Sequence, residues 1–435
     1  MANYIMHSLI NWRQAQNQVL RGCMLAFGVV GGDLTAQDEG LIGRWTTNST
    51  LLNPGIEPYA VLTAETWGNV SGGLRTGAWY DQLLDFGVKL DTEKFGWRNG
   101  GSFLIQGHWV ENVGDGPNFG AYTGAFNPVS GIMAEDHIRV FNLYYRHNWL
   151  DDAVQLKLGQ IAVDDDFMLS DYSGLFLNSA FGAMPSQVGT PLASSYGNGA
   201  PFPIYSVASP GVVIRVNPAE RIYSQLGLYY ANPGPDDPGN YGFDWVNQTP
   251  ELGLFWESGV GYSAWGHSGT LRLGMADQTG RTEDYRSRAN GKVVEQHAVP
   301  TFYVGNDFQL LAGGGGKAKL AAFCRVGFSS DEEASLVSLY VDGGLDWFGP
   351  IAARPDDTVG VAVSITDFGD AFCESTGPGG SAGTETTVEL AYKAQMTGWL
   401  SVQADAQVLF NPAIDSNSNS RETAIIIGMR VVLTF

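Results

Sequence analysis

Nine polar side chains stand at alternate positions in short segments whose other positions are apolar. Guanidinium, ammonium, carboxylate and amide groups form hydrogen bonds with hydroxylated molecules, and weak bonds of this kind let a solute exchange its hydration and leave again. The set therefore indicates a polar surface that faces water, although residue types and spacing do not identify a substrate. Its members are Lys157, Arg215, Arg272, Arg325, Glu389, Gln403, Asp405, Gln407 and Arg430.

For any one of these residues, an ion pair or hydrogen bond to a neighbouring strand is the competing role. The acidic run Asp164-Asp165-Asp166 has two interpretations as well. It could bind a divalent cation or repel anions, but a solvated loop face is the favoured interpretation.

Catalytic and metal motifs have no comparable support. Residues 379–383 match the GxSxG pattern, yet they lie in a Gly- and Thr-rich stretch instead of a strand-to-helix turn. Residues 313–317 resemble a phosphate-binding loop, but Leu311 and Ala318 replace the required Gly and Ser or Thr. The six histidines are scattered singly. We expect no catalytic residue, no metal site and no cofactor.

The segments that carry the polar set have the two-residue period of β-strands. Residues 424–435 place apolar side chains on one face and Arg430 on the other, and residues 400–410 do the same with Gln403, Asp405 and Gln407. A polar, turn-rich stretch joins the two, which predicts a hairpin. The same period recurs around residues 86–90, 103–109, 154–159, 212–217, 271–275, 320–326, 361–365 and 387–393.

Alternation alone also fits a soluble β-sandwich. Charged side chains on the inner faces would not suit a dry sandwich core, whereas a water-filled lumen accommodates them. Aromatic residues near strand ends, with Phe435 closing an apolar row, predict interfacial girdles. The aromatic candidates are Trp79-Tyr80, Trp97, Trp109, Tyr144-Tyr145, Trp149, Tyr229-Tyr230, Trp256, Trp347-Phe348 and Trp399.

Composition narrows the class of protein further. Charged residues make up 16% of the chain, aromatic residues 12%, and 57 residues are glycine. The charged fraction lies below the roughly one quarter usual in soluble proteins. The formal charge of -21 comes without a basic cluster, so we expect no nucleic-acid partner. Cys324 and Cys373 lack metal-like or redox-like spacing, and whether they form a disulfide is left open.

The N-terminal segment has the features of an export signal. Arg13 and Arg21 precede the apolar residues 23–30, and Ala36 supplies a small residue for cleavage. We predict a signal peptide over residues 1–36 and a single β-barrel domain over residues 37–435. An amphipathic N-terminus on a cytosolic protein is the alternative.

Several stretches resemble the carbohydrate-selective porins of the OprB family. The most specific is the C-terminal block, in which residues 399–407, Asn411-Pro412 and Gly428-Met429-Arg430 precede Phe435. Residues 90–97 (LDTEKFGW) and the stretches 156–160 and 176–179 also resemble the family. Ala404 stands where the family usually has proline.

The resemblance implies a transmembrane antiparallel β-barrel of about 16 strands in the outer membrane of a Gram-negative bacterium, with long loops that narrow the pore. It implies passive diffusion of monosaccharides such as glucose and of other small polar solutes. Expected partners are outer-membrane lipid, lipopolysaccharide and the barrel-assembly machinery, which would recognise the C-terminal strand. A homotrimer and a monomer are both open.

The uncharged stretch from Tyr172 to Ile214 is predicted to fold partly into the barrel and to form its narrowest section. An extracellular lid is the alternative for this loop. Three other functions are also weighed: a general or ion-selective diffusion porin, an outer-membrane barrel enzyme and a secreted glycan-binding β-sandwich.

Overall fold

A computed structural model describes most of the chain from Gly55 to Phe435. The described residues are 55–97, 100–114, 119–188, 202–264, 267–291, 295–297, 299–313, 318–331, 333–375, 383–412 and 422–435. All of them belong to the unit Glu39–Phe435. The predicted signal peptide, residues 1–36, lies outside the described residues. None of the helices in the described ranges is long and apolar enough to cross a membrane.

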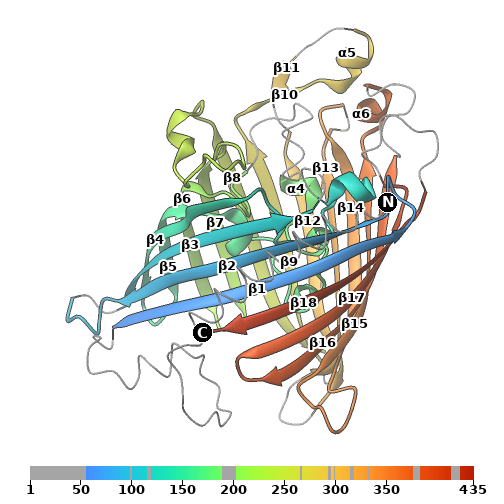
Figure 1. Ribbon diagram of the computed structural model, residues 1–435. Helices are drawn as coiled ribbons and strands as arrows, with labels where there is room; N and C mark the ends of the chain where they lie inside the picture. Colours follow the sequence, from blue (N-terminus) through green and yellow to red (C-terminus); the bar gives the residue numbers. More distant parts are fainter. Residues whose placement is uncertain are drawn as a thin grey trace. The chain divides into compact units, whose positions relative to one another are not determined.

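Sixteen strands of the described chain form one closed antiparallel barrel (Figure 1). Each strand pairs with its neighbours in the chain order, and β1 pairs with β18, from Val61 opposite Thr434 to Ser71 opposite Ile425. The strands are β1 (Ile56–Ser71), β2 (Gly77–Asp91), β3 (Gly101–Val113), β4 (His137–Trp149), β5 (Val154–Ile161), β6 (Ser209–Ala219), β7 (Ile222–Tyr230), β8 (Leu252–Ala264), β9 (His267–Gln278), β12 (Thr301–Ala312), β13 (Ala318–Ser329), β14 (Val337–Phe348), β15 (Thr358–Phe368), β16 (Thr384–Thr397), β17 (Leu400–Phe410) and β18 (Ala424–Thr434).

Short turns lie at one end of the barrel and longer connections at the other. Consecutive antiparallel strands reverse direction, so the turns 150–153, 220–221 and 398–399 share one end, while the connections 114–136, 162–208, 231–251 and 279–300 share the opposite end. Outer-membrane barrels have short periplasmic turns and long extracellular loops. The long connections therefore lie at the end that corresponds to the extracellular side of such barrels.

The connections carry short elements. The helices are α3 (Gly120–Thr123), η1 (Val163–Asp165), η2 (Ser173–Leu175), η3 (Ser179–Phe181), α4 (Pro185–Val188), η5 (Asp244–Asn247), α5 (Tyr285–Ala289) and α6 (Asp370–Ser375), and the strands β10 (Arg281–Glu283) and β11 (Glu295–His297) form a separate two-stranded sheet.

Side chains on each wall strand alternate between the two faces of the barrel, as predicted. On β18, Ile425, Ile427 and Met429 are 42–53% exposed, while Ile426 between them is fully buried. On β17 the buried inner row is polar, with Gln403, Asp405 and Gln407. An outward apolar row beside an inward polar row is the pattern of a barrel wall in lipid. The β-sandwich alternative is wrong, because the strands close into a single barrel.

The barrel interior also holds a large apolar cluster, which the sequence analysis did not anticipate. Phe167, Met184 and Phe126 from the long connections pack with Phe255 on β8 and Tyr340 on β14, and all five are at most 2% exposed. Part of the interior is thus a dry core, and the rest is left for the channel.

The aromatic prediction holds in part. Trp109, Trp149, Trp256 and Trp347 are at least 38% exposed, as an outward girdle requires. The girdle prediction is wrong for Trp79, because its side chain lies on the inner row of β2. There its ring packs edge-on against the Tyr122 ring, with 6.2 Å between the ring centroids. The prediction is also wrong for Tyr229, whose side chain is buried in the interior apolar cluster. Strand register decides whether such a side chain faces lipid or the interior, and a position near a strand end does not reveal the register.

The two cysteines of the barrel domain are not joined to each other. Cys324 has a free thiol and lies exposed on β13, in the same outward row as Val326 and Phe328. Cys373 lies on α6 and packs against the interior apolar cluster.

Candidate functional site: the loop-narrowed channel

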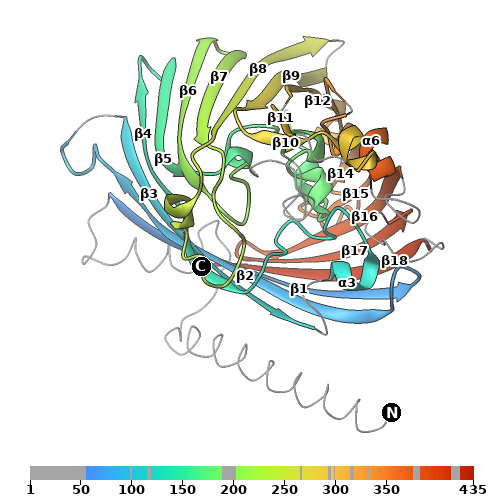
Figure 2. The same ribbon diagram turned by 90° about the horizontal axis from the view of Figure 1, so that it is seen from above.

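The connection from β5 to β6, residues 162–208, turns into the barrel. Its helix α4 contacts β12, β13 and β14 and lies inside the ring of strands in Figure 2. The connection therefore crosses the lumen to the opposite wall, which confirms that part of Tyr172–Ile214 folds inward. Two bounds differ from the prediction: the connection already starts at Ala162, and Ser209–Ile214 belong to β6.

Arg325 on β13 holds the far side of this loop. Its guanidinium donates hydrogen bonds to the carbonyl oxygens of Met168 (3.0 Å), Phe181 (2.8 Å) and Gly182 (2.7 Å). Its Nε also lies 3.1 Å from both carboxylate oxygens of Asp342 on β14. The last carbonyls of a short helix such as η3 lack partners within the helix. A planar group with five donors satisfies several of them at once.

Glu389 on β16 binds the middle of the loop. Its two carboxylate oxygens accept hydrogen bonds from the backbone N–H groups of Leu177 and Asn178, the latter at 3.0 Å. The Asn178 side chain donates to Gln407 on β17, also at 3.0 Å. Hydrogen bonds from backbone N–H groups to a carboxylate are roughly twice as strong as neutral ones. Leu177 and Asn178 are thus fixed against the wall.

Gln403 and Gln407 add two further contacts from β17. Gln403 donates to the carbonyl oxygen of Leu175 at 2.7 Å, and Gln407 donates to that of Val129 at 2.8 Å. Gln407 also donates to Asp405 at 3.1 Å. Val129 belongs to the connection between β3 and β4, so β17 holds both inward connections.

The connection between β3 and β4, residues 114–136, has its own carboxylate partner, Glu385 on β16. Glu385 accepts from the backbone N–H groups of Phe126 (2.7 Å) and Asn127 (3.0 Å). Nearby, Arg430 on β18 pairs with Glu65 on β1 and donates to Ser130 at 3.1 Å. Both long connections are therefore bonded to the same stretch of wall, from β16 to β18.

The remaining three predicted residues lie on the other side of the barrel. Lys157 on β5 forms an ion pair with Asp166 at 2.7 Å. Arg272 on β9 pairs with Asp307 on β12 and, at 3.3 Å, with Asp171 of the loop.

Arg215 on β6 keeps its contacts within the wall. Its guanidinium lies 3.9 Å from the ring centroid of Tyr223, and its Nε donates to Asn217 at 3.1 Å. All nine predicted residues thus face inward, but their polar groups bond to the wall and the inward loops. Contact between any of them and a passing solute stays a prediction.

Three carboxylates do face open space in the interior. The side chains of Asp171, Asp165 and Asp85 are 58%, 34% and 27% exposed. The sequence analysis missed Asp85, although its place between Leu84 and Phe86 on β2 follows the alternation. Asp171 carried no sequence signal, because it lies in an irregular loop. Each of the three has a basic neighbour: Arg272 for Asp171, Lys157 for Asp165 and Lys89 for Asp85.

The acidic run Asp164–Asp166 lies inside the barrel, so the prediction of a solvated loop face is wrong for Asp164 and Asp166, and the Asp165 side chain is only partly exposed. Asp166 is paired with Lys157, and Asp164 accepts a hydrogen bond from the Tyr205 backbone N–H at 3.2 Å. Desolvation, followed by repulsion from Asp165, raises the pKa of Asp164 to about 7. Desolvation also raises the pKa of Asp165. Within the described ranges, no group of three or more His, Cys, Asp or Glu is arranged to hold a metal ion.

Comparison with known proteins agrees with this architecture. The family model for the carbohydrate-selective porin, OprB family, matches residues 75–435. Porin B of Pseudomonas aeruginosa is 24% identical over 95% of this chain and 97% of its own length. The high-pH structure of Pseudomonas putida OprB superposes with a TM-score of 0.79 over 93% of this chain and all of its own, at 20% identity, and the low-pH structure with 0.57 over 92% of this chain and all of its own, at 18% identity.

A closed antiparallel barrel with an apolar outer face and loops bound across its lumen defines a porin of the Gram-negative outer membrane. The extent of the family match makes the assignment specific: the chain belongs to the carbohydrate-selective porin, OprB family. It is an outer-membrane porin for sugars.

Proposed function

We propose that the channel admits monosaccharides such as glucose, together with other small polar solutes, and strongly retards larger sugars. The observation that carries this proposal is the bonding of residues 162–188 to β13, β16 and β17 on the far side of the lumen. A segment bonded at both sides of the lumen reduces the open cross-section to what remains beside it. We infer that the connection 162–208 forms the narrowest section.

Selection among solutes of equal size would come from the interior polar groups. A neutral sugar offers hydroxyl groups that exchange water for hydrogen bonds with the lining, and it carries no net charge for the lumen to repel. The exposed carboxylates Asp85, Asp165 and Asp171 disfavour anions and give a weak preference for cations. Of the nine residues predicted from the sequence, we propose that Arg215 and Arg430, which are only partly buried, reach the solute most readily.

Proteoliposome swelling with a graded series of neutral sugars tests this proposal. We expect fast swelling with hexoses, a sharp fall for disaccharides and almost no swelling with trisaccharides. Equal rates for hexoses and disaccharides would favour the general diffusion porin, and strong anion selectivity in planar bilayers would contradict the acidic lining. We also propose that the protein is a channel without catalytic activity.

The partners follow from the same location. We propose contact with outer-membrane lipid and lipopolysaccharide, and insertion by the barrel-assembly machinery through β18. For the oligomeric state we keep both possibilities, a monomer and a homotrimer, and mass photometry of the detergent-extracted protein distinguishes them.

A further inference from the structure

The barrel wall is completed by a loop at the place where β5 is too short. β5 pairs with β4 only from Leu143 to Trp149, so the upper part of β4 has no β5 partner. The connection between β7 and β8, residues 231–251, supplies one: the Val140 backbone N–H donates to the carbonyl oxygen of Tyr241 at 3.1 Å. Gly242 follows with a φ of +105°, and a Cβ there would lie 2.0 Å from the Val140 oxygen. Only glycine allows this close approach.

Polar contacts behind the wall fix this loop segment. Arg139 on β4 pairs with Asp236 at 3.0 Å and donates to the carbonyl oxygen of Asp237 at 3.0 Å. Trp245 donates to the Gln160 side chain on β5 at 3.1 Å. The loop is therefore held as part of the wall, and Tyr241 and Phe243 remain 64% and 44% exposed.

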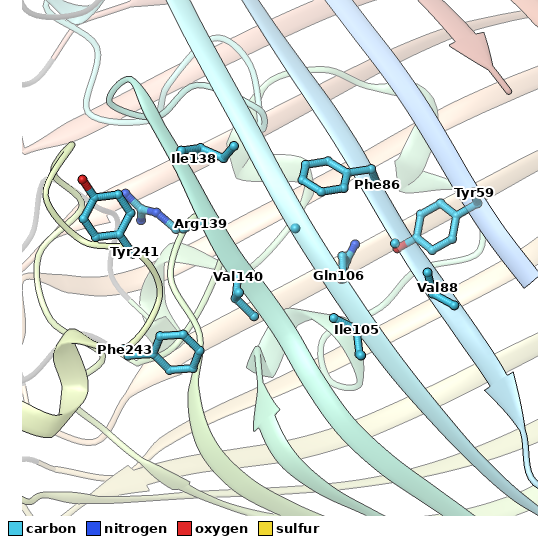
Figure 3. Close-up of a pocket in the computed structure, with 12 residues that line it drawn as sticks. Tyr59, Phe86, Val88, Ile105, Gln106, Ile138, Arg139, Val140, Tyr241 and Phe243 are labelled. Carbon is cyan, nitrogen blue, oxygen red and sulfur yellow. The ribbon is translucent and has the colours of Figure 1, made fainter. Parts of the chain in front are cut away.

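A hollow of about 540 Å³ lies between this loop segment and strands β2 to β4 (Figure 3). Gly107 is among the lining residues, in the outward row between Ile105 and Trp109, and its missing side chain leaves room for the Phe86 ring. The Phe86 ring leans over it, 2.7 Å from the position of a Cβ. The apolar side chains around the hollow are Phe86, Val88, Ile105, Ile138, Val140, Tyr241 and Phe243.

Side chains of the outward, lipid-facing rows border the hollow, which has few polar groups to offer. Ile105 and Ile138 belong to the outward rows and are 47% and 56% exposed. The polar ends of the other lining residues are engaged elsewhere: Tyr59 and Gln106 donate to Asp85, and Arg139 pairs with Asp236. A sugar or a headgroup would leave its hydroxyls without partners here.

We propose that this hollow binds one acyl chain of an outer-membrane lipid. The surface is continuous with the lipid-facing rows of a barrel in that membrane, so hydrocarbon is what meets it. An acyl chain gains no hydrophobic free energy when it moves from bulk lipid to this apolar surface, because the surrounding lipid tails are themselves apolar. Retention must instead come from the many close contacts that a concave wall makes with a single chain. The bound chain covers the place where a loop replaces a strand.

Lipid retention during detergent exchange tests the proposal. The protein is extracted from outer membranes in a mild detergent, exchanged into a second detergent, and its lipid is quantified by mass spectrometry after denaturation. Val88→Trp and Val140→Trp each place a large ring in the hollow, on different strands. Leu345→Trp on β14 adds the same ring to an exposed outward position elsewhere on the barrel and is the control.

We expect wild type and Leu345→Trp to retain about one lipid each, and the two hollow-filling variants to retain about tenfold less, a difference of about 1.4 kcal/mol. A photo-crosslinking side chain at Ile138 should form a lipid adduct, and one at Leu345 should lose its adduct on detergent exchange. Equal retention in all four proteins, detergent alone in the hollow, or a crosslink from Ile138 to a second copy of the chain would overturn the proposal. These outcomes do not depend on the swelling of proteoliposomes in different sugars. A result there that contradicts the proposed sugar selectivity would therefore leave the lipid proposal unaffected.

Discussion

Weakening the loop's attachment to β16 and β17 should widen the channel without unfolding the barrel. Glu389→Gln keeps the size of the side chain but removes its charge, and Gln403→Ala removes the bond to the Leu175 carbonyl. Both residues lie on the inner face, so neither substitution alters the lipid-facing rows or the strand pairing. The double variant releases the segment from Leu175 to Asn178 from the wall at two points.

The expected size of the effect follows from the bonds removed. Glu389 accepts two backbone N–H groups, and hydrogen bonds to charged groups contribute about 1.5–3 kcal/mol each, whereas a neutral bond contributes about 1 kcal/mol. A glutamine that retains one neutral bond therefore costs about 2–5 kcal/mol of docking free energy, and Gln403→Ala adds about 1 kcal/mol. The released state of this segment should become more populated by a factor of about 100 or more.

Swelling rates for a disaccharide, relative to a hexose, report the change. We expect this ratio to rise modestly in Glu389→Gln and further in the double variant, with greater current noise in planar bilayers. Tyr392→Phe is the matched control, since it removes a hydrogen bond from the same strand, to Asp357 in a turn, without a contact to the loop. If the double variant keeps the wild-type ratio and noise while circular dichroism shows an intact barrel, the inference that this loop sets the size limit is refuted.

Two further predictions concern charge. Asp171→Asn removes an exposed carboxylate from the lumen and leaves Arg272 paired with Asp307. The cation-to-anion permeability ratio, measured from reversal potentials, should therefore fall by up to about fivefold, the effect of a unit charge close to the ion path. An unchanged reversal potential would contradict an acidic lining. Asp164 has a pKa raised to about 7, so the folded state holds a proton that the unfolded state has already lost, and stability falls as pH rises from about 4 to 7. Asp164→Asn should therefore be more stable than wild type, and the difference in Tm in detergent should grow between about pH 5 and about pH 8, which lie on either side of the pKa. A difference in Tm that does not change with pH would contradict this.

The barrel wall could be predicted from the sequence because its signal is local. On β17 and β18 every second residue is apolar, and this period alone assigns Ile425, Ile427 and Met429 to the lipid and Gln403 to the interior. The number of strands was not contained in the period, and it entered only through the family resemblance. Trp79 shows the limit of the local signal: an aromatic residue near a strand end fits a girdle and an interior core equally well until the register is known.

The interior was harder to predict because its contacts join residues far apart in the chain. Glu389 meets Leu177 and Asn178 across more than 200 positions, and no periodicity links them. Asp171 had no sequence signal for the same reason, since its exposure depends on how the loop crosses the lumen. The segment from Ala162 was partly anticipated, from the absence of charge and the density of Gly and Pro in Tyr172–Ile214, which suit a compact loop.

A loop inside a barrel places a specific demand on the inner wall. Its irregular backbone carries N–H and C=O groups that strand pairing does not satisfy, and buried backbone groups need partners. Arg325 and Glu389 meet this need for one loop, and Glu385 meets it for the other. The number of polar residues on the inner faces therefore overstates the number available to a sugar, because many of them hold the structure that narrows the channel. Residues that act on the solute should be sought among those with remaining exposure, such as Asp171 and Arg430.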